Sequence, residues 1–179
     1  AAVGSEFGAE TSVGTNTELI YNDSIGEVFQ EEGFDAVLTE GAPRALNGDA
    51  NGVAEGAAGL RVLPRNRRLT DDVGYRFSNE DWSGHPLLAD QYASWLSSID
   101  GDPVTLFMDI ETFGEHHWRG TGVLDFLDAL PEKSDDRDVE FTTVSDAISR
   151  HPTSSGFRAG DMDTVSWADS DMDPPAWVG

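Results

Sequence analysis

Cysteine is absent from the 179 residues of this chain, and its absence excludes several kinds of site. Without a thiol the chain has no disulfide framework, no cysteine nucleophile and no thiolate metal centre. Its apolar runs are far shorter than the ~20 residues of a membrane-spanning helix. The first residues, Ala1 to Gly4, lack the basic start and long apolar stretch of a secretory leader. We therefore expect a cytoplasmic protein with no membrane partner.

Positive charge is also scarce. The chain has 11 Lys and Arg against 34 Asp and Glu, a net charge of −23, and Lys133 is its only lysine. Such a surface repels nucleic acid and anionic membranes, so neither is an expected partner. The acids are spread between apolar segments, and five Trp and nine Phe favour a folded protein over a disordered one. Molar salt screens charges beyond about 3 Å, so the composition predicts a protein adapted to high salt.

The order of signals along the chain alternates between strand and helix, which predicts an α/β fold with parallel strands. Strands are expected at residues 15–20, 36–39, 60–63, 104–108 and 139–142. Helices are expected from a cap at Asn22 to a stop at Gly33, after a cap at Thr70, and at 87–96, 122–130 and 144–149. The Gly-, Ala- and Asn-rich stretch 41–59 is expected to be a flexible loop, and 160–179 an acidic tail.

The richest chemistry follows the strand expected at 104–108. Its apolar run stops at Asp109, and further acids, two histidines and Trp118 come within nine residues. A buried parallel strand presents polar groups in this way at the mouth of an α/β barrel. Carboxylates transfer protons, imidazoles form hydrogen bonds and an indole stacks on a flat apolar face, so the cluster suits a sugar. The alternative is a strand followed by a solvated polar loop.

A second acid, Glu18, stands inside the apolar segment Asn16 to Tyr21. A buried carboxylate is costly unless it is paired or functional, so Glu18 is either a catalytic acid or a residue that holds a loop or an arginine at the rim. About three βα units of ~30 residues each separate Glu18 from Asp109. Both acids are therefore expected at the carboxyl ends of strands, facing each other across a barrel mouth.

The remaining polar residues allow more than one interpretation. Glu111 would share a face with Asp109, where it hydrogen-bonds sugar hydroxyls or orients its neighbour. Adjacent His116 and His117 point in different directions and lack H-x-x-x-H spacing, so we expect no metal site, with one imidazole lining the site and the other facing solvent.

The basic cluster 65–68 could serve a phosphate, but the acids that follow it favour internal ion pairing. Trp167 and Trp177 are candidates for stacking on sugars, although aromatic residues in a tail more often pack on a core.

Both acidic segments resemble the archaeal-type α-amylase branch of glycoside hydrolase family 57. Residues 108–118, M-D-I-E-T-F-G-E-H-H-W, are similar to that branch's M-D-Y-E-T-F-G-E-H-Q-W, which places its general acid/base at Asp109. Residues 16–21, N-T-E-L-I-Y, are similar to its F-R-N-T-E-L-I-Y, whose Glu is the nucleophile, here Glu18. Residues 63–78 and 165–169 look like a third and a fourth shared block. The chain departs from the pattern at Gly14-Thr15, Ile110 and His117.

The resemblance implies a retaining glycosidase that acts on α-glucans such as starch or glycogen and needs no cofactor. Glu18 is then the nucleophile, and Asp109, the more desolvated of the two, is the acid/base. Implied substrate contacts are Glu111, His116, Trp118, Arg65, Asp72, Trp167 and Asp169.

The family fold is an incomplete seven-stranded barrel, and residues 1–179 match only about its last four βα units. We therefore expect an incomplete fragment, either active or inactive alone, whose partner is a separate chain carrying the N-terminal barrel half. Three alternatives stay open: a non-catalytic glucan-binding remnant, a metal-dependent hydrolase or deacetylase using Asp109, His116 and His117, and a structural halophilic domain without a site.

Overall fold

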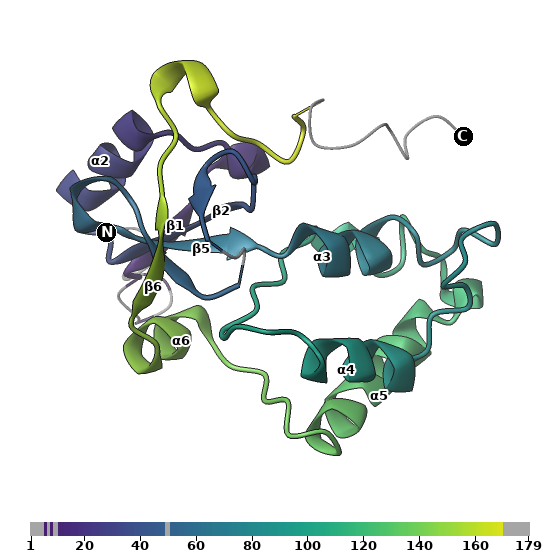
Figure 1. Cartoon of the computed structure of the whole chain (residues 1–179). Helices are drawn as coiled ribbons and strands as arrows, with labels where there is room; N and C mark the ends of the chain where they lie inside the picture. The colour runs from purple at the N-terminus through teal and green to yellow at the C-terminus, as the bar shows by residue number, and fades with distance from the viewer. Residues whose placement is uncertain (1–5, 7, 9–10, 49–50, 170–179) are drawn as a thin grey trace. The chain divides into compact units, whose positions relative to one another are not determined.

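The computed structural model describes residues 6, 8, 11–48 and 51–169. Those within 1–65, 101–105 and 143–179 form one compact unit, and residues 66–100 and 106–142 form a second. The first unit holds the sheet with helices α2 and α6, and the second holds helices α3, α4 and α5 (Figure 1). Across the described residues, no helix combines the length and apolar character needed to cross a membrane.

The first unit is built on a six-stranded mixed sheet with the order β1-β2-β5-β4-β6-β3. Neighbouring strands β1, β2 and β5 are parallel, while β4 runs antiparallel to β5 and β3 antiparallel to β6. The strands are β1 (Val13–Thr15), β2 (Ala36–Glu40), β3 (Leu46–Asn47), β4 (Val53–Glu55), β5 (Arg61–Arg65) and β6 (Thr153–Phe157).

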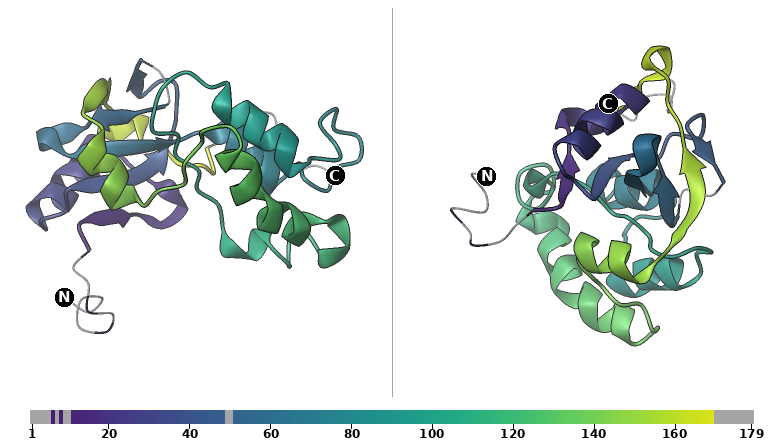
Figure 2. Two further views of the ribbon diagram at one scale, coloured as in Figure 1. Left: turned by 90° about the horizontal axis from the view of Figure 1, so that it is seen from below. Right: turned by 90° about the vertical axis from the view of Figure 1, so that its left-hand side faces the viewer.

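Helices cover both faces of this sheet (Figures 1 and 2). Val37 belongs to the core on one face, where Phe29 of helix α2 (Asp23–Glu31) packs. Leu63 belongs to the core on the other face, with helix α6 (Val144–Arg150). Because side chains alternate along a strand, strands buried on both faces carry apolar residues at nearly every position. This explains why the sequence signals for β2 and β5 are strong.

The ends of α2 follow the sequence prediction. The side chain of Asn22 accepts a hydrogen bond from the backbone N–H of Ile25 at 2.8 Å, which satisfies a free donor at the start of the helix. Gly33 follows the helix with φ +86°, a conformation that glycine adopts without steric cost. The predicted cap and stop are both confirmed.

The second unit has a helical core formed by α3 (Arg67–Gly74), α4 (Ala89–Ser97) and α5 (Val123–Asp135). Tyr92 of α4 packs edge-on against Phe126 of α5 with ring centroids 5.6 Å apart, and its hydroxyl donates to the carbonyl of Leu69 at 2.8 Å. Burial raises the pKa of the Tyr92 phenol, so it remains a neutral donor. Five 3₁₀ turns complete the described structure: η1 (Thr17–Leu19), η2 (Ala57–Gly59), η3 (Ile110–Thr112), η4 (Arg119–Thr121) and η5 (Asp161–Asp163).

Three of the predicted strands differ from the structure. The strand expected at 15–20 ends at Thr15, and the turn η1 follows it. At 104–108 only Thr105 pairs, through a single parallel bridge to Arg65, and 139–142 form no strand. Strand β6 was not expected, because its sequence T-S-S-G-F lacks an alternating apolar pattern. The pairs β1–β2, β2–β5 and β4–β6 are parallel and the pairs β4–β5 and β3–β6 are antiparallel, so the predicted parallel arrangement is confirmed only in part.

Two loop predictions and one cap also need correction. The stretch expected to be a flexible loop contains β3, β4 and η2, and Val53 and Ala54 are fully buried because small side chains permit close packing. Helix α3 is capped by Asn66, whose side chain accepts from the N–H of Leu69 at 3.1 Å, and not by Thr70. In the expected tail, Val165 is buried; residues 170–179, with Trp177, lie outside the described residues.

Candidate active site

Three polar residues meet where the parallel strands of the first unit end. Glu18 follows β1, Glu40 is the last residue of β2 and Arg65 is the last residue of β5. The carboxyl ends of parallel strands lie at one edge of a sheet, where α/β enzymes place their functional groups. Arg65 Nε lies 2.7 Å from Glu40 Oε2, and the two residues are 3% and 0% exposed. Glu40 Oε1 accepts from the N–H of Gly41 at 3.1 Å, so both carboxylate oxygens are bonded.

Glu40 was not among the residues expected at the site. It ends the apolar run A-V-L-T-E, and this acid at a strand end is the same signal that identified Asp109. The basic cluster 65–68 was expected to pair with the acids after it. Arg67 does so with Asp71, at 3.5 Å, but Arg65 pairs with Glu40 on the adjacent strand. Register explains the choice, because Glu40 and Arg65 are directly paired across the β2–β5 ladder.

Glu18 has an unusual backbone. Its φ and ψ are 52° and 21°, and Leu19 also has φ 52°, the left-handed region that residues other than glycine occupy at a cost of about 1–3 kcal/mol each. The turn is fixed by the N–H of Ile20, which donates to the carbonyl of Thr17 at 3.0 Å, and by the hydroxyl of Thr39, which donates to the carbonyl of Leu19 at 3.0 Å. The side chain of Glu18 is exposed, contrary to the prediction of an acid buried in a strand.

A segment distant in sequence holds Glu18 in place. Tyr21 and Val165 form an antiparallel bridge, with N···O distances of 2.9 and 2.8 Å. The hydroxyl of Ser166 and the N–H of Trp167 then donate to the carbonyl of Glu18 at 2.8 and 3.2 Å. The indole Nε1 of Trp167 donates to Glu18 Oε2 at 2.5 Å. On its ring face, Trp167 meets the guanidinium of Arg65, whose Cζ lies 5.7 Å from the ring centroid.

Asp109 lies in the second unit, at the start of a tightly folded loop. The N–H groups of Glu115 and His116 both donate to the carbonyl of Glu111, at 3.1 and 2.9 Å. Asp109, Glu111 and His116 are exposed, and Trp118 is 73% exposed. The expectation of a desolvated Asp109 is therefore wrong for this structure, because the acid lies beyond the end of the packed segment.

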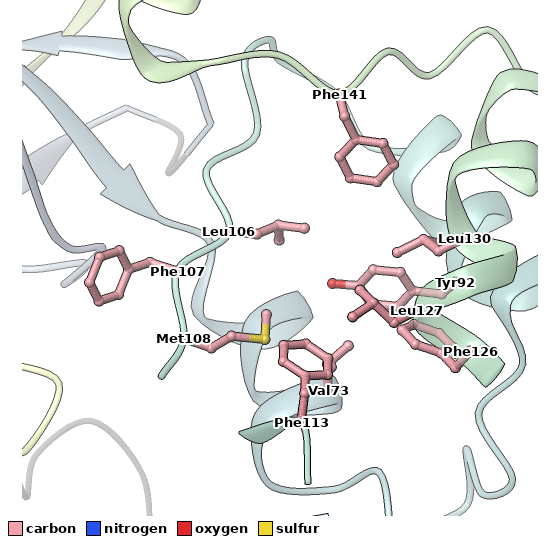
Figure 3. Close-up of a pocket in the computed structure, with 10 residues that line it drawn as sticks. All are labelled: Val73, Tyr92, Leu106, Phe107, Met108, Phe113, Phe126, Leu127, Leu130 and Phe141. Carbon is pink, nitrogen blue, oxygen red and sulfur yellow. The ribbon is translucent and has the colours of Figure 1, made fainter. Parts of the chain in front are cut away.

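The segment that precedes Asp109 lines an apolar pocket of about 290 Å³ (Figure 3). Leu106 and Met108 point into it, and Phe107, between them, points the other way, as expected of an extended backbone. The pocket is lined by Val73, Tyr92, Leu106, Phe107, Met108, Phe113, Phe126, Leu127, Leu130 and Phe141. None of these side chains is charged, so the pocket does not suit a polar substrate.

His117 is a buried residue of the same loop and stabilises it through hydrogen bonds. It is 4% exposed; its Nε2 lies 3.0 Å from the carbonyl of Gly74 and its Nδ1 lies 2.6 Å from the hydroxyl of Ser78. Because a carbonyl only accepts, the proton sits on Nε2 and Nδ1 accepts from Ser78. His117 is thus an internal residue, and His116 is the exposed one of the pair. Burial lowers the pKa of His117 below its usual value.

This shift predicts an acid-sensitive fold. Between the lowered pKa of folded His117 and about 6.5, the unfolded chain binds more protons than the native one, so the free energy of unfolding should fall as pH drops through this window. We expect His117→Gln to remove this part of the pH dependence, measured by urea unfolding from pH 7.5 to 5. The exposed neighbour variant His116→Gln should keep it. An unchanged slope in His117→Gln would contradict the assignment.

Other predicted contacts are engaged within the protein. Asp72 is 3% exposed and accepts from Arg76 Nη1 at 2.8 Å; burial raises its pKa. Asp169 forms an ion pair with Arg44, which also donates to the carbonyl of Thr164 at 2.9 Å. Over the part of the chain that the structure describes, no group of three or more His, Asp or Glu side chains is arranged to hold a metal ion.

The structure thus brings Glu18 together with Trp167 and Arg65, and places Glu111, His116 and Trp118 on one loop after Asp109. Glu18 belongs to the first unit and Asp109 to the second. Comparison with known families shows that a model described as "Glycosyl hydrolase family 57" matches residues 2–157, which include both acids. The chain belongs to glycosyl hydrolase family 57.

Two similar proteins extend this result. A Methanocaldococcus jannaschii protein named "Putative alpha-amylase" is 42% identical over 175 residues, covering 97% of this family 57 chain and 38% of that protein. The crystal structure of 4-alpha-glucanotransferase from Thermococcus litoralis aligns with a TM-score of 0.61 at 18% identity, covering 84% of this chain and 24% of that one. At this identity the second match shows the fold alone. The chain spans less than two fifths of either protein.

Proposed function

We propose that this chain carries the two catalytic carboxylates of a retaining glycosidase acting on α-glucans, with Glu18 as nucleophile and Asp109 as general acid/base. The observation that carries the proposal is the setting of Glu18. Its carboxylate lies exposed at the carboxyl end of β1, on a strained backbone, with one oxygen held by an indole N–H. An accessible carboxylate of fixed orientation is what a covalent nucleophile requires.

In the first step, a Glu18 oxygen forms a bond to the anomeric carbon while the bond to the leaving oxygen breaks and Asp109 protonates that oxygen. In the second, Asp109 takes a proton from water, the water oxygen attacks the anomeric carbon, and the ester to Glu18 breaks. The two inversions give net retention. The mechanism requires carboxyl groups about 5–5.5 Å apart in the productive complex.

Substrate contacts are best assigned to the loop after Asp109. Glu111 and His116 are exposed hydrogen-bonding groups, and Trp118 offers a largely exposed apolar face. Arg65, Asp72 and Asp169 have charged partners within the chain, which favours structural roles for them. Because the chain spans 38% of its amylase-like relative, we assign it the two carboxylates and not a full set of sugar subsites.

The stereochemistry of the first product tests this proposal. On soluble starch we expect release of reducing sugar, and ¹H NMR of the newly formed end should show the α anomer before mutarotation. An initial β anomer would contradict the retaining mechanism and indicate an inverting one. Starch binding without sugar release would favour the non-catalytic glucan-binding alternative, and loss of activity on exhaustive chelation would favour the metal-dependent one.

A further inference from the structure

We propose that Trp167 is a positioning residue that orients the Glu18 carboxylate, and that the buried Glu40–Arg65 pair holds the indole in place. The proposal rests on the proposed role of Glu18 as nucleophile. It assigns Trp167 a different role from the sugar-stacking one that the sequence suggests.

The first support is the direction of the indole N–H. A tryptophan side chain has a single polar group, which only donates. In this structure that group donates to Glu18 Oε2 at 2.5 Å. With Oε2 bonded, Oε1 is the oxygen left to attack a sugar, so one hydrogen bond selects the attacking atom.

The second support is that Trp167 itself is held from several directions. Its backbone N–H and the Ser166 hydroxyl both donate to the carbonyl of Glu18, so the residue that positions the carboxylate is tied to the same turn. The Tyr21–Val165 bridge fixes the segment on the other side. Ser166 and Trp167 therefore hold the backbone and side chain of Glu18, and Val165 attaches this segment to Tyr21.

The third support is the contact between the Trp167 ring and Arg65. The Arg65 guanidinium faces the indole, and Arg65 cannot move away easily because its Nε is bonded to Glu40 in a pair that is almost fully buried. A guanidinium over a tryptophan face is attractive as well as confining. Glu40, Arg65, Trp167 and Glu18 form a continuous series of contacts from the core of the sheet to the exposed carboxylate.

These contacts distinguish positioning from substrate stacking. A stacking platform needs an open ring face, as Trp118 has with 73% of the residue exposed. Trp167 is half-buried, with its N–H engaged by Glu18 and its ring against Arg65. Loss of the indole N–H should therefore slow the chemical step and leave sugar affinity little changed.

Trapping of the covalent intermediate tests this directly. With 5-fluoro-α-maltosyl fluoride, Glu18 forms a bond to the anomeric carbon, fluoride leaves, and the 5-fluoro group slows hydrolysis of the ester. Mass spectrometry then gives the trapping rate and the inhibitor affinity separately. Trp167→Phe keeps an aromatic ring against Arg65 but removes the donor. A hydrogen bond to a charged group corresponds to roughly a ten- to hundredfold effect, and we expect a slower maximal trapping rate of this size with inhibitor affinity within about twofold.

Trp82→Phe is the matched control, because it makes the same substitution at a half-buried tryptophan of the second unit, whose ring packs edge-on against Trp95. It should trap at nearly the wild-type rate. A second readout is the Trp167 indole ¹H–¹⁵N resonance, identified by its loss in Trp167→Phe. It should shift as Glu18 titrates and become independent of that titration in Glu18→Gln.

The outcomes separate the two proposals. Suppose that the wild type is trapped at Glu18. If Trp167→Phe is trapped at an equal rate, or loses only inhibitor affinity, the positioning role of Trp167 is overturned and the nucleophile assignment stays intact. An indole resonance that ignores Glu18 would overturn positioning as well. Absence of any Glu18 adduct in the wild type would overturn the nucleophile, and a titrating indole would then be a structural contact only.

Discussion

Replacing Glu18 by glutamine is expected to lower kcat on soluble starch by at least about 10⁴-fold, since removing a covalent nucleophile has cost ~10⁶ in another hydrolase. Glutamine keeps the size of the side chain and an oxygen that accepts from Trp167, so the turn should remain folded. Its amide is too weak a nucleophile to form the glycosyl ester. The measurement is the release of reducing sugar, with Glu31→Gln on the exposed surface of α2 as a charge-matched control that should retain activity.

Azide rescue distinguishes the two carboxylates. In Glu18→Ala, azide occupies the space of the lost carboxylate and attacks an activated α-glucosyl fluoride directly, which gives the β-glucosyl azide. In Asp109→Ala, the glycosyl ester still forms on Glu18 and azide then displaces it, which gives the α-glucosyl azide. The opposite pattern would exchange the two roles. Wild-type activity in Glu18→Gln would remove the catalytic assignment altogether.

Breaking the Glu40–Arg65 pair is expected to have the largest effect on stability. Removing one partner leaves an uncompensated charge in the core, at a typical cost of 3–5 kcal/mol. We therefore expect Glu40→Met and Arg65→Met each to lower the melting temperature by about 10 °C, since 1 kcal/mol corresponds to ~2–4 °C in proteins of this size. Thermal unfolding followed by circular dichroism measures the change.

The double variant Glu40→Met with Arg65→Met is the control. Because it removes both charges together, it should be more stable than the sum of the single losses predicts, as apolar replacement of a whole buried pair is often nearly neutral. Additive losses would show that the two residues act through other contacts. The double variant should still trap the fluoride inhibitor more slowly than the wild type, because the guanidinium that faces the indole is gone.

Local sequence patterns predicted those parts of the fold that depend on interactions between residues close in sequence. The Asn22 cap, the Gly33 stop and strands β2 and β5 follow from side-chain hydrogen bonding, left-handed backbone and dense apolar residues. The motif around Asp109 identified the family, and the family model confirms it. High-salt adaptation and the catalytic roles stay predictions, since no structural feature described above measures them.

What the sequence could not predict depends on pairing between distant segments. Glu40 becomes the partner of Arg65 only through the register of β2 against β5. The sequence does not distinguish His117 from His116, because only the folded loop buries the His117 imidazole against Gly74 and Ser78. β6 pairs with β4 despite a weak pattern because its neighbours supply the burial. Tertiary context decided each case.

The hydrogen bond between Glu18 and Trp167 joins residues 149 positions apart, and this separation has a consequence for biosynthesis. Domains begin to fold while the ribosome is still adding residues, at about 5–20 per second. Strands β1, β2 and β5 are made early, but Trp167 is translated about 7–30 s after Glu18 at those rates. During that interval the Glu18 carboxylate lacks the hydrogen bond that orients it, although the three parallel strands beside it have already been made.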